Sequence, residues 1–385
     1  MPIFDAFPFR SGFTLTLQIA RPFAEPVLEM AIRYSFPFGF LAMIPLSRLV
    51  GPLMPWAIVP AFVVLFLVFD AAFGSSEHEE RNTGSRLAYR MIPWAYIPVQ
   101  LATILWGAVD ASQSTSIAAI LGLATATGGA TGIFGMLAAH EMIHSRARGE
   151  RALGLMMLAG VTYMHFRVSH LQGHHRLAAT PADSATARRG ESVYRFVLRS
   201  ITGQLRDTWR WERDRTADRD WPLLANRLVR YAGATLVIYA AFDIVLGWRS
   251  LLFQGTQSAI AILVLELFDY VAHYGLLRRA LPGGGAEPLA PWHSWNTTRR
   301  FSNWCLLNGG HHSAHHRAPA RVYQDLRPVP STPRLPFGYA GTMLLALVPP
   351  LWRRVMDRRL QDWRGEAQSP APPVPRRTRH DDRAA

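Results

Sequence analysis

Residues 117–144 read IAAILGLATATGGATGIFGMLAAHEMIH, and this stretch decides the class of fold. Residues 117–139 carry no charged side chain, and the run is long enough to cross the hydrocarbon core of a bilayer as a helix. It ends directly at His140, Glu141 and His144. Ionisable residues at a membrane span are functional candidates by default, because burying them is costly. The stretch therefore predicts a membrane helix that delivers histidines to one face of the membrane.

Other apolar runs repeat this pattern along the chain, and short connections pair the runs into three hairpins. Hydrophobic residues make up 49% of the chain and charged residues 18%, whereas about a quarter of a soluble domain is charged. We predict an all-α integral membrane protein with about six transmembrane helices. The expected spans lie near residues 34–50, 54–73, 92–109, 117–139, 231–246 and 251–268.

The spans and the motifs described below belong to one stretch of chain. We therefore predict a single membrane domain over residues 34–363. A segment of residues 1–33 precedes it on the cytoplasmic side. A tail of residues 364–385, rich in proline, arginine and alanine, follows and is expected to be disordered.

Charge sets the expected orientation of these spans. The chain has a formal net charge of +14, and residues 140–230 hold 16 arginines against 9 acidic residues. The positive-inside rule then puts this segment and the histidines on the cytoplasmic side of the cell's inner membrane, in a multi-pass protein. The same rule accounts for the basic charge without nucleic acid, for which the chain carries no recognition motif.

Histidines gather at the ends of the predicted spans. Side chains four apart lie on one face of a helix, so His140 and His144 can offer two imidazoles to one metal. His170 and His174 repeat this spacing, and His175 is expected to point aside towards a second metal. Imidazole suits iron, zinc, copper and nickel, and nine rings are too many for one ion. We predict two metal ions held by His140, His144, His170, His174, His175, His273, His312, His315 and His316. How the nine ligands divide between the ions is left open.

Several kinds of function use such histidines. The segment His140-Glu141-Met142-Ile143-His144 alone also matches a zinc protease, in which Glu141 would be the general base. A desaturase and a non-catalytic metal carrier are further alternatives. The single cysteine, Cys305, excludes a cysteine-ligated iron–sulfur cluster within the chain, and no nucleotide-binding fingerprint follows a strand. Electrons for a redox reaction would therefore come from an external carrier.

The motifs together resemble the membrane-bound non-haem di-iron alkane hydroxylases, or alkane 1-monooxygenases. HEMIH at 140–144 resembles the family's HELxH box, and HLQGHHRLAATPADSATARRGES at 170–192 resembles its second histidine box. ELFDYVAHYGL at 266–276, HSWN at 293–296 and HSAHHRAPARVYQ at 312–324 resemble the family's remaining motifs. The resemblance covers about residues 35–363.

The resemblance implies the activity and its components. O₂ and two electrons would hydroxylate an apolar substrate, such as the terminal carbon of a medium-chain alkane, at a pair of iron ions without haem or bound nucleotide. The electrons would come from rubredoxin or a similar acidic carrier and its reductase. A desaturase or a xylene-type hydroxylase of aromatic methyl groups is the alternative on the same scaffold. The sequence does not specify the chain length of the substrate, a preference for aromatic substrates or the oligomeric state of the protein.

Three positions depart from the family pattern. Ser169, Ala272 and Ala314 stand where the family typically has acids. Such acids would orient histidine ligands, because a carboxylate that accepts the distal imidazole N–H fixes the tautomer. The acids that remain nearby, Glu141, Glu266 and Asp269, are our candidates for this supporting role.

Overall fold

The computed structural model describes residues 31–76 and 86–368, and these residues are helical apart from loops and three isolated β-bridges. The first half comprises η1 (Arg33–Ser35), α2 (Phe36–Val50), α3 (Pro55–Phe73), α4 (Arg86–Gln113), α5 (Ile117–Ala130), η2 (Thr131–Gly135), α6 (Met136–His144), α7 (Arg148–Gly160), α8 (Phe166–Val168), η3 (Ser169–His174) and α9 (His175–Leu177). The second half comprises α10 (Val193–Thr216), α11 (Pro222–Ala225), α12 (Arg227–Leu246), α13 (Trp248–His273), η4 (Pro291–His293), α14 (Arg300–Cys305), α15 (His312–Arg317), η5 (Tyr323–Asp325), α16 (Tyr339–Ala346) and α17 (Pro349–Gln368).

Five helical segments within the described ranges are long and apolar enough to cross a membrane: α3, α4, the continuous segment Ile117–His144, α12 and α13. They match five of the six predicted spans, and the all-α membrane fold is confirmed. The remaining predicted span, 34–50, forms the 15-residue helix α2. At 1.5 Å per residue α2 reaches about 22 Å, short of a bilayer core of about 30 Å.

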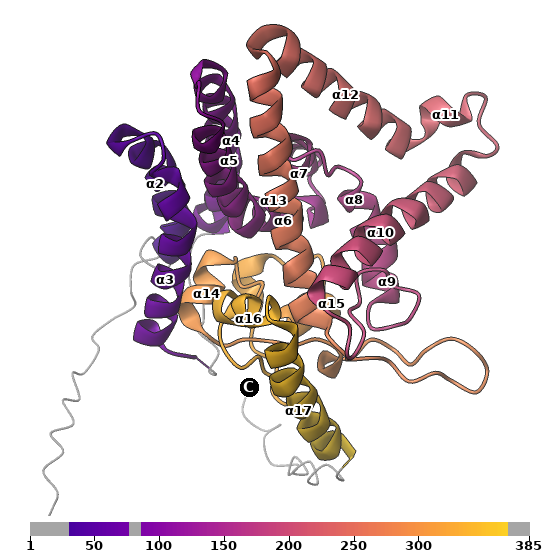
Figure 1. The fold of residues 1–385 in the computed structure, drawn as a ribbon. Helices are drawn as coiled ribbons and strands as arrows, with labels where there is room; N and C mark the ends of the chain where they lie inside the picture. The colour runs from indigo at the N-terminus through magenta and orange to yellow at the C-terminus, as the bar shows by residue number, and fades with distance from the viewer. Residues whose placement is uncertain (1–30, 77–85, 369–385) are drawn as a thin grey trace, which may run out of the picture.

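The three predicted hairpins are present as α2–α3, α4–α5 and α12–α13 (Figure 1). The predicted domain boundary at residue 363 falls inside α17, which ends at Gln368. Nearly all of the predicted N-terminal segment and most of the predicted tail lie outside the described residues.

Helix α5 and the turn η2 that follows it pack closely on α13, because glycines face the contact. A Cβ added to Gly128 would lie 2.5 Å from the carbonyl oxygen of Gln257, and one added to Gly132 would lie 2.6 Å from Cβ of Val264. Small residues let membrane helices approach in this way. Between α5 and α6 the π-helical turn η2 interrupts the helix. The close packing brings the histidine ends of α6 and α13 to the same end of the bundle.

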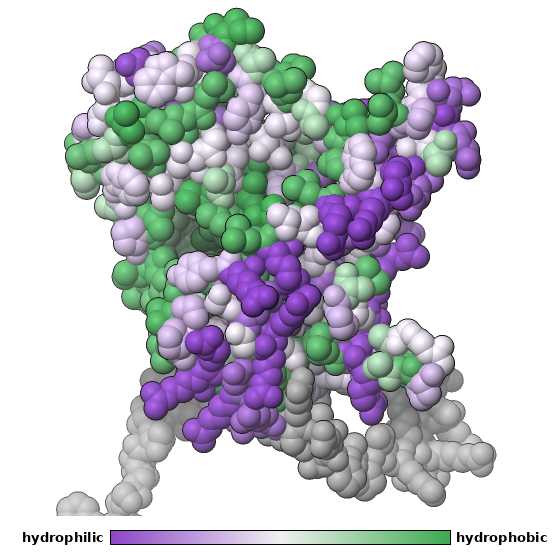
Figure 2. Space-filling model, turned by 45° about the vertical axis from the view of Figure 1, so that its right-hand side comes forward, coloured by the Kyte–Doolittle hydropathy of each residue, from purple (hydrophilic) through white to green (hydrophobic). Residues whose placement is uncertain are grey.

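The chain after α13 covers that end of the bundle. The carboxylate of Asp70, near the end of α3, accepts hydrogen bonds from the backbone N–H of Ser302 at 2.9 Å and its hydroxyl at 2.7 Å. Helices α14 to α17 lie below the bundle in Figure 1. Figure 2 shows hydrophobic side chains over the upper part of the molecule and hydrophilic ones gathered around the lower part and along one side. This distribution fits a protein whose upper helices sit in lipid.

A buried acid ties α10 to the start of α12. Glu212 has a fully buried side chain, accepts hydrogen bonds from Arg215 at 2.7 Å and Arg227 at 2.9 Å, and also accepts the backbone N–H of Arg227 at 2.8 Å. Burial raises the pKa of this carboxyl, but the bonds to Arg215 and Arg227 outweigh it and lower the pKa to about 2. The ionised form is therefore the one that stabilises the fold.

We expect this ion cluster to make stability depend on acidity. Because the folded pKa is depressed, the stabilisation is complete above pH 4.5 and is lost as the pH falls towards 2. Glu212→Gln should lower stability at pH 7 by about 3–5 kcal/mol, since it leaves two arginines without their buried partner. Thermal unfolding in detergent checks this, and an unchanged midpoint in the variant at pH 7 would contradict it. Asp214→Asn, at a 66% exposed acid on the same helix, is the matched control.

Candidate metal centre

Five elements bring all nine predicted histidines together. The last turn of α6 carries His140 and His144, the end of α13 carries His273, and η3, α9 and α15 carry the rest. The nine rings form two groups at the lower end of the bundle. One group has five members, His140, His144, His170, His175 and His315. The other has four, His174, His273, His312 and His316.

The spacing of the ring nitrogens tests whether these groups fit metal ions. Nε2 of His175 lies 2.9 Å from Nε2 of His170 and 3.1 Å from Nε2 of His144. In the other group, Nε2 of His312 lies 2.9 Å from Nε2 of His273 and 3.0 Å from Nε2 of His316. Two nitrogens bound to one ion at about 2.1 Å and at angles of about 90–109° lie about 3.0–3.4 Å apart. Both groups therefore fit a bound ion.

The second histidine box divides differently from our expectation. We expected His170 and His174 to share a metal and His175 to point elsewhere, but His170 and His175 share the five-histidine group and His174 joins the other. The reason is that Ser169–His174 forms a π-helical turn, in which the repeat is i to i+5. The ring centroids of His170 and His175 accordingly lie 4.5 Å apart, and those of His170 and His174 lie 5.3 Å apart.

Helix α15 likewise serves both groups. His312 and His316, four residues apart, belong to the four-histidine group, and His315 belongs to the five-histidine group. One short helix thus fixes the position of both groups relative to each other. Among the described residues, three other buried histidines, His165, His293 and His311, belong to neither group.

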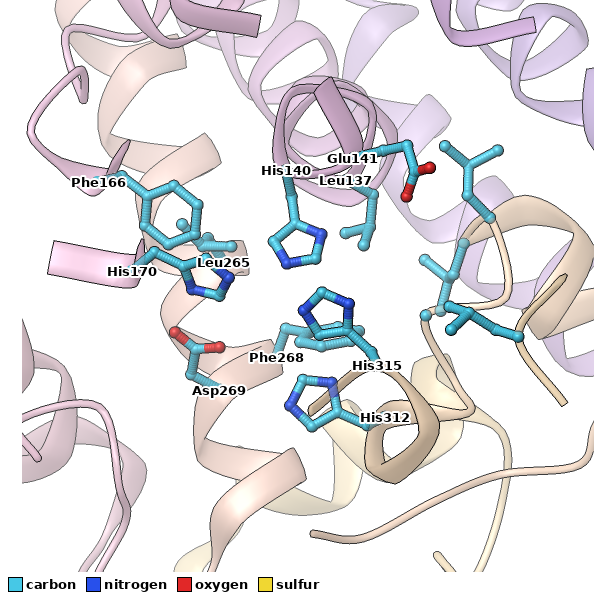
Figure 3. A pocket seen from close by; sticks show the side chains of 14 residues that line it. Leu137, His140, Glu141, Phe166, His170, Leu265, Phe268, Asp269, His312 and His315 are labelled. Atoms are coloured by element: carbon cyan, nitrogen blue, oxygen red, sulfur yellow. The ribbon is translucent and has the colours of Figure 1, made fainter. Parts of the chain in front are cut away.

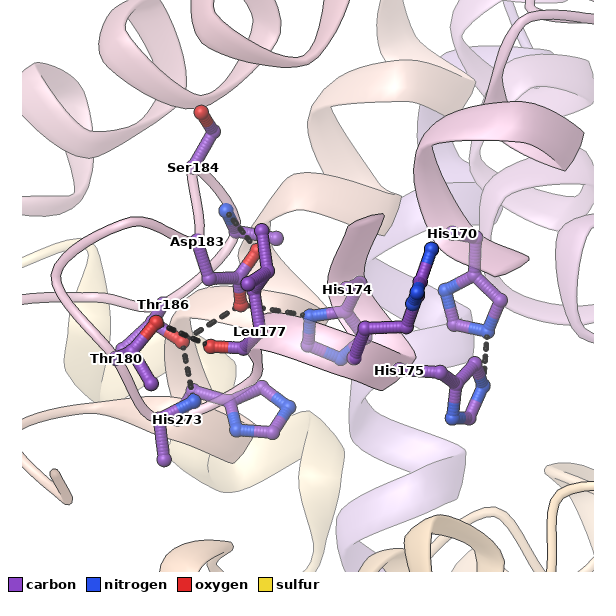
Figure 4. Close-up of polar contacts among 12 residues, drawn as sticks. His170, His174, His175, Leu177, Thr180, Asp183, Ser184, Thr186 and His273 are labelled. Carbon is purple, nitrogen blue, oxygen red and sulfur yellow. Dashed lines mark hydrogen bonds and ion pairs between the residues drawn. The ribbon is translucent and has the colours of Figure 1, made fainter. Parts of the chain in front are cut away.

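One carboxylate orients a ligand directly, and the sequence analysis did not select it. Oδ2 of Asp183 lies 2.9 Å from Nδ1 of His174 and accepts the hydroxyl of Thr186 at 2.7 Å (Figure 4). Nε2 of His174 has no hydrogen-bonding partner among the residues that the structure describes, so its lone pair is free for an ion. Asp183 lies in the second histidine box at 170–192, nine residues after His174. This position is the only feature of the sequence that points to a role at the metal centre.

The electrostatics favour neutral ligands. Burial lowers the pKa of His170, His175, His312, His315 and His316 well below the ordinary value, which keeps these rings unprotonated at neutral pH. Burial also raises the pKa of Asp183, but the neighbouring His174 and the hydrogen bonds to it outweigh burial and hold that pKa below its usual value. Burial alone would lower the pKa of His174, but the ionised Asp183 outweighs burial and raises that pKa, so this ring holds a proton more tightly than the five rings above and must lose it to bind a metal.

Two of the three acids predicted to support the ligands, Glu141 and Glu266, have other partners. Glu141 accepts the backbone N–H of Tyr323 at 3.0 Å and so holds the loop after α15 against α6. Glu266 accepts the hydroxyl of Tyr163 and the amide of Gln204, each at 2.9 Å. Ser169 donates to the amide oxygen of the same Gln204 at 2.9 Å. Ser169, which stands where the family typically has an acid, is therefore linked to Glu266 through Gln204.

A largely apolar pocket opens beside both groups (Figure 3). His140, His170 and His315 of the five-histidine group and His312 of the other reach its wall, together with Asp269. The rest of its lining is mostly hydrophobic and includes Leu137, Phe166, Leu265, Phe268, Leu306 and Leu307. The chemistry of this lining suits a hydrocarbon, to which it offers few hydrogen bonds.

Comparison with known proteins agrees with this chemistry. Residues 114–341 match the family model described as fatty acid desaturase. The chain is 34% identical over 317 residues to alkane 1-monooxygenase 2 of Pseudomonas aeruginosa, covering 80% of this chain and 84% of that protein. It is 36% identical over 280 residues to the alkane 1-monooxygenase of Ectopseudomonas oleovorans, with coverages of 72% and 70%. It is 27% identical over 262 residues to the xylene/toluene monooxygenase hydroxylase component of Pseudomonas putida, with coverages of 67% and 68%.

Proposed function

Because this chain belongs to the alkane 1-monooxygenase family, within the wider fatty acid desaturase family, we propose that it is a membrane di-iron monooxygenase that hydroxylates a hydrocarbon. The observation that carries this proposal is the apolar pocket lined by histidines of both groups. When bound, the two irons would supply the redox chemistry by which O₂, two electrons and two protons convert a C–H bond to an alcohol and release one water.

The residues of the chain have three tasks in this reaction. The five- and four-histidine groups would each hold one iron, with Asp183 orienting His174. Apolar residues such as Phe166, Leu265 and Phe268 would hold the substrate against the pocket wall and exclude water. The membrane helices would give the substrate access from lipid, in which a hydrocarbon is most soluble.

Product analysis tests the proposal. Purified protein in lipid, loaded with ferrous iron and given O₂ and a reducing system, should convert medium-chain alkanes to alcohols with one oxygen atom from O₂. Xylene in a parallel reaction tests the alternative of aromatic methyl hydroxylation, which the likeness to the xylene/toluene enzyme component favours as second candidate. Alkene as the product would instead indicate a desaturase, and release of peptides with one bound zinc would indicate a protease.

We further propose that the metal centre faces the cytoplasm across the inner membrane, as the positive-inside rule predicts. The electron donor would be rubredoxin or a similar acidic carrier, served by its reductase. A groove that we call the Trp211 groove fits this partner. It is lined by Trp211 with Arg188, Arg199, Arg206, Arg210 and Asp207, and Arg206 and Arg210 are 62% and 59% exposed.

The Trp211 groove also leads to the metal ligands. The half-buried indole of Trp211 packs so closely on Gly173 that a Cβ there would collide with the ring. Gly173 precedes His174 in the chain, and Trp211, His174 and Asp183 line one small pocket beneath the groove. An acidic carrier drawn to the arginines would thus dock over the four-histidine group.

Reversing charges in the Trp211 groove should weaken docking of the electron carrier without changing the metal centre. We expect Arg206→Glu combined with Arg210→Glu to raise the KM for rubredoxin at least about tenfold at low salt, because like charges now face each other. The value of kcat should change little. High salt should reduce the difference in KM between variant and wild type, because it screens the charges. Steady-state kinetics at two salt concentrations check this. Arg353→Glu with Arg358→Glu on α17 is the matched control, and an equal rise of KM there would contradict the assignment.

A further inference from the structure

A second pocket, with a polar lining, lies next to the apolar pocket. Its cavity volume is about 40 Å³. One water molecule needs about 10–15 Å³ of such space, so a hydroxyl group fits. Helix α14, the residues that follow it and the chain after η5 supply most of its wall. We call it the polar pocket, and its lining includes Asn303, Trp304, Asn308, His311, Leu326 and Arg327.

A thin wall formed by residues 306–312 separates the two pockets. Leu306, Leu307, Gly309 and His312 of this segment line the apolar pocket, whereas Asn308 and His311 line the polar pocket. Two glycines leave only backbone at the centre of the wall. A Cβ at Gly309 would lie 3.2 Å from Cδ1 of Leu137 in the apolar pocket. One at Gly310 would lie 2.5 Å from Oδ1 of Asn303 in the polar pocket. The space beside the histidine groups and the polar space are therefore one layer of chain apart.

The wall is held in a fixed shape. Leu307 and Asn308 have φ angles of 48° and 55°, a left-handed conformation that few residues other than glycine adopt. The side-chain amide of Asn308 donates to the hydroxyl of Tyr34 at 2.9 Å and to the carbonyl oxygen of Tyr323 at 3.0 Å. Such strained backbone persists only where its surroundings hold it, and it clusters at functional sites.

Leu326 lies at the boundary of the two pockets, because it lines both. The residue is buried, and its backbone N–H donates to the carbonyl oxygen of Tyr323 at 3.1 Å. This bond fixes the backbone and leaves the side chain free to change its rotamer. A change of rotamer at this one leucine would connect the two pockets without moving the wall.

The polar pocket contains buried groups that need a partner. Nδ1 of His311 and Oδ1 of Asn303 make no hydrogen bond with any residue that the structure describes, although the two residues are only 8% and 4% exposed. Buried polar groups in proteins are nearly always hydrogen-bonded, so this pocket calls for a polar guest. His311 directly precedes His312, which extends with His315 from α15 into the apolar pocket (Figure 3). A guest at His311 thus lies close to the place where the substrate would react.

We propose that the polar pocket receives the hydroxyl group of the alcohol product, which reaches it past Leu326 and so leaves the metal centre. This inference rests on the proposed hydroxylation of a hydrocarbon. An alkane has no polar atom to place in this pocket, whereas an alcohol can exchange hydrogen bonds with His311 and Asn303. The alkyl chain would stay among the hydrophobic residues of the apolar pocket. The polar pocket thus distinguishes product from substrate by one hydroxyl group.

Inhibition by the product tests this role of the polar pocket. In iron-loaded protein in lipid, we would measure the inhibition constant of 1-octanol and the KM for octane. His311→Leu should raise the inhibition constant about three- to tenfold, the effect of losing one hydrogen bond between neutral groups. The KM for octane should not change, because octane makes no such bond. His165→Leu is the matched control and should change neither value, since His165 is also buried with an unpartnered Nε2 but is absent from the lining of both pockets.

A second variant tests the route to the polar pocket. Leu326→Trp places a larger side chain at the boundary and should raise the inhibition constant of 1-octanol by a similar factor. Combining it with His311→Leu should add little, because both changes remove the same contact and contacts that depend on each other are not additive. Independent effects that multiply in the double variant would overturn the route past Leu326.

The remaining outcomes separate this proposal from the proposed function. An unchanged inhibition constant in His311→Leu, or an equal rise in its KM for octane, would overturn the role of the polar pocket and leave hydroxylation intact. Wild type that forms no alcohol would overturn both. His311→Phe, which keeps a ring without nitrogen, should behave as His311→Leu does. His311→Gln, which keeps a hydrogen-bonding side chain, should stay near wild type, and the opposite order of these two variants would contradict the proposal. Iron content and the thermal midpoint of each variant identify a folding defect.

Discussion

His312→Ala is expected to remove one metal ion and abolish turnover. His312 belongs to the four-histidine group, where its Nε2 lies 2.9 Å from that of His273 and 3.0 Å from that of His316. Loss of an outer-shell partner alone costs about 10–100-fold, so loss of a ligand should lower activity more than about 100-fold. The iron content should fall from two ions per chain to one, because the five-histidine group is untouched. Elemental analysis and product formation measure both effects.

The neighbouring residue supplies a matched control. His311 is also buried but belongs to neither histidine group. His311→Gln should therefore retain two irons per chain. Two irons in the His312 variant, or loss of both ions from the His311 variant, would contradict the division of ligands described above.

Asp183→Asn should produce the second largest loss of iron affinity or activity. The carboxylate lies 2.9 Å from Nδ1 of His174, and the ring's Nε2 is the atom left for the metal. An amide removes the negative charge behind the ring and lowers its basicity, so we expect iron affinity or activity to fall about 10–100-fold. A chelator titration should show one ion released early and the other unchanged. Asp214→Asn, at an exposed acid, should behave as wild type, and equal iron retention in both variants would refute the role of Asp183.

The membrane fold could be predicted because the bilayer imposes a length on every span. Runs such as 54–73 and 251–268 stand out as apolar stretches; the first coincides with α3 to within one residue, and the second falls within α13. The ends of helices were harder to predict, since a helix continues past the lipid wherever protein covers it. The helical segment that begins at Ile117 thus continues through the π-helical turn η2 to His144.

The ligands themselves could be predicted, but their division could not. The rule that residues four apart share a face assumes an α-helix, and it holds for His140 with His144 and for His312 with His316. It fails at Ser169–His174 because that turn is π-helical, a conformation that spacing alone does not reveal. Asp183 was missed for a related reason, since its contact with His174 depends on the path of the loop between α9 and α10.

Anomalous scattering at the iron absorption edge tests the central claim most directly. In a structure of the iron-loaded protein, we expect two separate peaks for each chain, one enclosed by His140, His144, His170, His175 and His315 and the other by His174, His273, His312 and His316. A single peak, or a signal at the zinc edge in place of iron, would contradict a di-iron monooxygenase.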